Sequence, residues 1–135
     1  MGNLVVIEFP EEHTAFAVRA ELAKMQKEYL IKMEDVVVVT KDEKSKVKLH
    51  QAVNLTMAGA ASGSFWGMLM DIGIEDKFIK EFSANFTPGA SALFVLFREA
   101  SGDKVLERLK AFKGKVLKTS LAMDDEEKLR KVLEA

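Results

Sequence analysis

The stretch LVVIEFP at residues 4–10 decides the class of fold, because it is short, rich in β-branched residues and ended by a proline. Such a segment predicts a strand that closes into a turn. Between residues 12 and 30 the period changes, and apolar side chains recur at intervals of three and four: Ala15, Val18, Leu22, Met25 and Tyr29. This spacing predicts one amphipathic helix, so the chain opens with a strand followed by a helix.

The next segments of the chain alternate between the strand-like and the helix-like pattern of apolar residues. Residues 36–39 are four valines and residues 47–53 lean toward alternation, so together they predict a β-hairpin. A helical face carrying Phe78 and Phe82 follows later in the chain, and Thr87-Pro88-Gly89 ends that helix before a strand at residues 92–97.

The last third of the chain predicts helix, strand and helix. Ser101 or Asp103 is the expected N-cap of the first of these helices, and Gly114 is its expected left-handed C-terminal stop. A strand at residues 116–121 comes next. Asp124 and Glu127 resemble a capping box that opens the final helix.

The order of these elements predicts an α+β fold: a ferredoxin-like βαββαβ core with an additional αβα C-terminal extension. A chain of 135 residues fits a single domain, residues 1–135. The strands at 36–39 and 92–97 are apolar on both faces, whereas helices in a plain ferredoxin-like sheet cover one face. We therefore expect the C-terminal helix or a second copy of the chain to cover the other face, and favour a homodimer or higher homo-oligomer.

The composition of the chain restricts which binding partners and which cellular location we expect. Twenty basic and 21 acidic residues give a net charge of -1, so no long-range field draws the chain to nucleic acid. The sequence contains no cysteine, and its N-terminus lacks the pattern of a secretory signal. We expect a cytoplasmic protein that does not bind nucleic acid.

The segment at residues 55–70 lies in a stretch without charged residues and carries glycines at a spacing of four, Gly59, Gly63 and Gly67. On a helix these three glycines share one face, which lets another backbone approach closely, and Trp66 fills the edge. This glycine-zipper segment is interpreted as a helix packed on the sheet, with a membrane segment and a flexible loop as alternatives.

Six stretches look like the bacterial "predicted membrane protein" family, domain of unknown function 1269; they lie at residues 27–31, 47–56, 65–67, 71–74, 91–96 and 114–121. The resemblance implies a chain without an assigned activity, attached in full-length relatives to the inner membrane. Relatives usually carry a longer hydrophobic stretch between Phe65-Trp66-Gly67 and Asp71-Ile72-Gly73-Ile74 than this chain does.

The motifs of the common enzymes are not found in the sequence. The glycine spacing matches neither a dinucleotide fingerprint nor a phosphate loop, and His13 and His50 lie on different expected elements without a partner. We expect no catalytic residue, no metal and no cofactor, with His50 as a possible pocket residue. The leading hypothesis is a non-enzymatic, self-associating domain that is membrane-associated through the zipper in full-length relatives; the alternative is a soluble small-ligand-binding or sensing domain.

Overall fold

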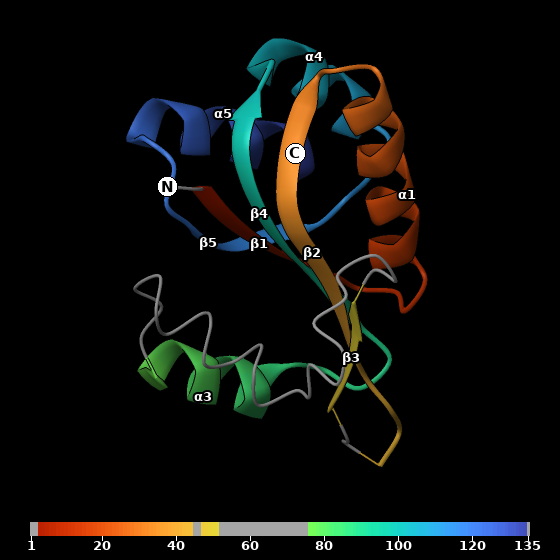
Figure 1. Ribbon diagram of the computed structural model, residues 1–135. Coiled ribbons are helices and arrows are strands. Elements are labelled where there is room, and N and C mark those ends of the chain that lie inside the picture. The colour runs from red at the N-terminus through yellow and green to blue at the C-terminus, as the bar shows by residue number, and fades with distance from the viewer. Residues whose placement is uncertain (1–2, 45–46, 52–75, 135) are drawn as a thin grey trace.

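The computed structural model describes residues 3–44, 47–51 and 76–134. Within them the fold is α+β, with a five-stranded antiparallel sheet and four helices (Figure 1). The elements in chain order are β1 (Asn3–Phe9), α1 (Thr14–Lys27), β2 (Ile31–Lys41), β3 (Val47–Gln51), α3 (Asp76–Asn85), β4 (Ser91–Ala100), α4 (Gly102–Leu109), β5 (Lys115–Thr119) and α5 (Met123–Leu133). The glycine-zipper segment lies outside the described residues.

The sheet has the strand order β3-β2-β4-β1-β5, so strands distant in the sequence are neighbours. β4 lies between β2 and β1, and Val95 pairs with Val36 on one side and with Val5 on the other. α1 therefore connects two strands that flank β4, and α4 connects β4 to β5 across β1.

This order differs from the expected assignment of the core strands. The hairpin of β2 and β3 forms as predicted, but β3 lies at the edge of the sheet, and β4 occupies the position between β1 and β2. The physical reason is burial. The first five residues of β4 are all buried, which suits a central strand, whereas Lys48 of β3 is exposed, which suits an edge.

The two faces of the sheet are covered by different helices. On the first face, which carries Val5, Ile7 and Val95, α1, α4 and α5 pack in one hydrophobic cluster. On the second face, which carries Val6 and Phe94, α3 packs in a separate cluster. Figure 1 shows α3 apart from the other three helices. The cover expected from the C-terminal helix thus comes from α3, and α5 lies on the same face as α1.

Three phenylalanines of α3 attach that helix to the second face. Phe82 and Phe86 stack with ring centroids 4.8 Å apart, and Phe82 meets Phe94 of β4 edge to face at 5.4 Å. Phe78 stacks on Phe82 at 6.3 Å, which confirms the predicted helical face. Aromatic pairs at these separations add about 0.5–1.5 kcal/mol each beyond the burial of their area.

One position of the apolar face predicted for the first helix is wrong, because Tyr29 lies beyond the end of α1 and is exposed. Tyr29 follows the helix in the left-handed region, at φ 63°, and its side chain is 94% exposed. The N–H of Leu30 donates to the carbonyl of Met25 at 2.9 Å, and the N–H of Tyr29 donates to that of Gln26 at 3.1 Å. These bonds form a Schellman motif, in which glycine is the usual left-handed residue.

Two expectations about helix ends are wrong. Gly114 does not adopt a positive φ, and α4 already ends at Leu109. Gly114 is instead a point of close approach, because a Cβ there would lie 2.7 Å from the ring of Phe9. The expected capping box at Asp124 is replaced by an N-cap at Ala122, which leaves Asp124 inside the first turn of α5.

Candidate functional site

A cavity of about 480 Å³ lies between the first face of the sheet and helices α1, α4 and α5. Its volume falls in the range of about 300–1,000 Å³ that is typical of small-molecule sites. The interior lining is aliphatic and comes from all these elements, including Val5, Val18, Leu22, Val95, Leu109 and Leu129. The cavity is therefore an apolar site bounded by a sheet on one side and helices on the other.

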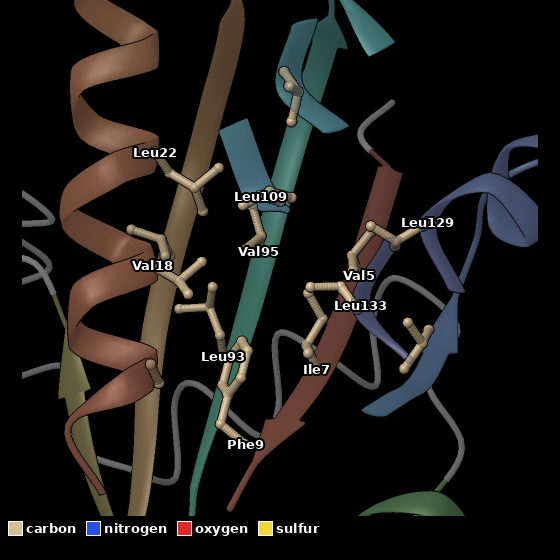
Figure 2. Packing of buried hydrophobic residues seen from close by; sticks show 14 of the residues in the cluster. Val5, Ile7, Phe9, Val18, Leu22, Leu93, Val95, Leu109, Leu129 and Leu133 are labelled. Atoms are coloured by element: carbon tan, nitrogen blue, oxygen red, sulfur yellow. The ribbon is translucent and has the colours of Figure 1, made fainter. Parts of the chain in front are cut away.

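The alternation of the strands and the helical period direct these side chains inward. Val5 and Val95 are register partners on neighbouring strands, so both point to the same face. Figure 2 shows Leu109 of α4 near Val95 and Leu129 of α5 near Val5, and all four belong to one hydrophobic cluster. Each of these four side chains is at most 6% exposed, so buried residues form this part of the cavity wall.

Polar groups of the cavity gather at its mouth. Asp103 in the first turn of α4 and Asp125 in the first turn of α5 line it, together with Lys128 one turn further along α5. All three are exposed. Arg98 and Glu99 at the end of β4 complete the rim. The site thus combines a buried aliphatic lining with exposed charged residues.

A network of side chains holds α5 against β5 and so fixes one wall of the cavity. The hydroxyl of Thr119 donates to Glu126 Oε1 at 2.6 Å, and Arg130 Nε donates to Glu126 Oε2 at 3.2 Å. These bonds from Thr119 and Arg130 lower the pKa of the Glu126 carboxyl. On the strand, the N–H of Val116 donates to Glu134 Oε2 at 2.8 Å, and its carbonyl accepts from Arg130 Nη1 at 3.1 Å. The outer edge of β5 is occupied at this residue, which protects it from pairing with another strand.

The opposite wall is attached to α1 through Arg108 of α4. This guanidinium contacts Glu21 at 2.5 Å and Glu28 at 3.1 Å, both on or next to α1. Hydrogen bonds to Glu21 and then to Glu28 raise the pKa of Arg108. The two helices that flank the mouth are therefore fixed separately, α5 to β5 and α4 to α1.

A second hollow of about 670 Å³, lined by Glu8, Lys113, Lys115 and Glu134 among others, lies near Gly114. Burial raises the pKa of Glu8, and the charge of Lys115 opposes this shift. Oppositely charged groups share this surface, and it lacks the continuous apolar lining of the first cavity. The cavity between sheet and helices is the better candidate site.

His50, the possible pocket residue, does not line the cavity. Its Nε2 lies 3.0 Å from the hydroxyl of Thr40, and its ring meets Phe16 of α1 edge to face at 5.1 Å. Arg19 Nη1 donates to the carbonyl of His50 at 3.0 Å. Burial, then the charges of Arg19 and Lys48, lower the pKa of His50. This histidine joins the edge strand to α1.

The other candidates from the sequence are placed as follows. Gly59, Gly63, Trp66 and Gly67 lie outside the described residues. In the described ranges, no group of three or more His, Asp or Glu side chains is arranged to hold a metal ion. Nor does any described helix combine the length and the apolar character that crossing a membrane requires.

The model of the family "Protein of unknown function (DUF1269)" matches residues 51–134, which is more than half of the chain. The chain belongs to this family. No curated protein and no solved structure matched it. The matched region of this DUF1269 member contains β4, α4, β5 and α5, and so includes Val95, Leu109, Leu129 and the charged mouth.

Sequence reasoning identified no part of the cavity in this DUF1269 member. Its lining residues have the signature of ordinary core positions, such as the alternation that turns Val5 and Val95 inward. The available signal was the first turns of α4 and α5, where Asp103 was interpreted only as a possible N-cap and Asp125 directly follows the residue that was interpreted as the start of a capping box. That both acids line one cavity follows from the packing of the two helices against the sheet.

Proposed function

We propose that this chain is a non-enzymatic domain that binds a small apolar molecule between its sheet and helices α4 and α5. The observation that carries the proposal is the cavity of about 480 Å³, in which every buried lining residue is aliphatic and every charged lining residue is exposed. This is the small-ligand-binding alternative from the sequence. Its location differs from the expected one, because His50 takes no part.

The energetics of an unfilled cavity support a ligand. Apolar space that side chains leave unfilled is unfavourable, because the lining residues lose packing contacts there, and an apolar ligand restores those contacts. Water fills such space poorly because the interior supplies no polar partner.

A ferredoxin-like core is part of the proposal. The strand order β2-β4-β1-β5, with α1 and α4 as the two connecting helices, supports such a core built from β1-α1-β2 and β4-α4-β5. In this arrangement β3 and α3 belong to an insertion between the two halves. Clefts between sheet and helices then arise where the two crossover helices separate, which is where the cavity lies.

The test uses a substitution that fills the cavity. Val95→Phe places a ring in the interior, and Leu96→Phe, on the next residue of β4 and the opposite face, is the matched control. We expect the apolar fluorescent probe N-phenyl-1-naphthylamine to bind the wild type and Leu96→Phe, and Val95→Phe to lose at least tenfold in affinity. Circular dichroism checks that each variant is folded. Equal binding by a folded Val95→Phe would refute the site.

We further propose that the chain self-associates and that longer relatives attach to the inner membrane through the zipper segment, with the folded domain in the cytoplasm. Support comes from the sequence, in which Gly59, Gly63 and Gly67 are spaced by four. Gly63→Leu is expected to lower the sedimentation coefficient or the fraction bound to phospholipid vesicles. Lys24→Leu, at an exposed position of α1, adds the same side chain as a control. If both variants match the wild type, the zipper carries no association.

A further inference from the structure

The polarity of the cavity lining specifies the shape of a ligand more closely than its volume does. The buried lining residues are all aliphatic, Phe97 and Asn3 are partly exposed, and the charged lining residues are all exposed. A molecule with polar groups along its length would lose hydrogen bonds to water inside this cavity without replacement. An aliphatic chain with a single polar head matches the lining, with the head left in the mouth.

The volume is consistent with such a chain. A cavity of about 150 Å³ accommodates one benzene molecule, so 480 Å³ accommodates roughly three times as much apolar material. A chain of about ten carbons is therefore within the capacity of the site. Each buried methylene contributes about 0.8 kcal/mol, which makes the chain the main source of affinity.

The charges at the mouth distinguish among head groups. Arg98 is paired with Glu34 at 3.1 Å. Within the described ranges, none of the other charged rim residues (Glu99, Asp103, Asp125 and Lys128) forms an ion pair. Three carboxylates thus face one ammonium group. The N-termini of α4 and α5 add about half a positive charge each, which reduces but does not cancel the negative excess.

From this juxtaposition, and on the basis of the function proposed above, we propose that the cavity binds a single-chain amphiphile with a cationic amine head. The aliphatic chain lies between Val95 and Leu109, and the amine lies between Asp103 of α4 and Asp125 of α5. Lys128, which also lines the cavity, disfavours a second positive charge on the ligand.

The experiment compares three probes of one chain length at pH 7: decylamine, 1-decanol and decanoate. Each displaces N-phenyl-1-naphthylamine from the wild type at low salt and at about 0.15 M salt. We expect decylamine to bind at least about fivefold more tightly than decanoate, with 1-decanol between them, and the difference to shrink with salt. The double variant Asp103→Asn and Asp125→Asn should abolish the preference, and Glu107→Gln, an exposed acid of α4 that does not line the cavity, should retain it.

The outcomes separate this inference from the function on which it rests. If all three probes bind equally, or decanoate binds best, the amine head is refuted while the apolar site stands. If the double variant keeps the preference, the placement of the head is refuted. If the dye binds but none of the probes displaces it, the amphiphile is refuted while the apolar site stands. If the dye does not bind the wild type, both the inference and the proposed function fail.

Discussion

Substituting Gly114 by alanine tests whether close packing, and not backbone freedom, explains this glycine. A Cβ at this position would lie 2.7 Å from two ring atoms of Phe9 and 2.9 Å from Cγ2 of Ile7. Both neighbours are buried, Phe9 completely and Ile7 at 3% exposure, so an added methyl group would have to displace one of these packed side chains or shift the backbone. The N–H of Gly114 also donates to the carbonyl of Leu133 at 3.1 Å, so a shift here would reach α5.

Overpacking of this kind costs about 1–3 kcal/mol. For a chain of this length each kcal/mol corresponds to about 3–5 °C in Tm, so Gly114→Ala should melt roughly 3–15 °C below the wild type. Gly102→Ala is the matched control, because nothing lies within 4 Å of a Cβ there and the position is helical. It should be neutral or more stable by up to about 1 kcal/mol.

Urea and thermal denaturation followed by circular dichroism measure both variants. A Gly114→Ala protein within about 0.5 kcal/mol of the wild type, which is the usual range of surface substitutions, would refute the close approach. A loss of equal size in Gly102→Ala would show that any added methyl group is harmful, and would remove the argument from Phe9 and Ile7.

Two further predictions concern residues in unfavourable surroundings. Tyr29→Gly should raise the free energy of unfolding by up to about 1 kcal/mol, because glycine adopts the left-handed φ of 63° without strain and the 94% exposed ring makes almost no packing contacts. Tyr29→Ala keeps the strain and should not raise the free energy of unfolding. Urea titration of the two variants distinguishes them. Asp35→Asn should raise the free energy of unfolding at pH 7 by up to about 1 kcal/mol after solvent screening. The reason is that Oδ1 of Asp35 is buried without a partner in the described structure. Burial raises the pKa of this carboxyl, and a hydrogen bond from the backbone of Val36 opposes that shift. Because the carboxyl pKa is raised in the folded state, the ionised Asp35 destabilises the fold above that pKa. The stability gained by Asp35→Asn should therefore be full at neutral pH and vanish as the pH falls below the unfolded value of 3.8. A stability gain that is constant from pH 3 to pH 7 would contradict this cause.

The elements of the fold were predictable because each is encoded within one segment. The valines at 36–39 are buried in β2, and Ala15, Val18, Leu22 and Met25 form the buried face of α1, as their spacing predicts. Membership of the family was also predictable from short stretches of sequence, and the match over residues 51–134 confirms it. These features depend on the local period of hydrophobicity or on the order of residues, both of which are present in the chain before it folds.

Strand neighbours, helix cover and the cavity were decided only in the tertiary structure. Whether β3 or β4 lies between β1 and β2 depends on which strand buries both faces best, and that is a comparison among segments far apart in the sequence. The same holds for Gly114, whose neighbours Phe9 and Ile7 are more than a hundred residues away. The cavity exists because side chains from six elements do not fill the space between them, and local periodicity carries no information about the volume that remains after packing.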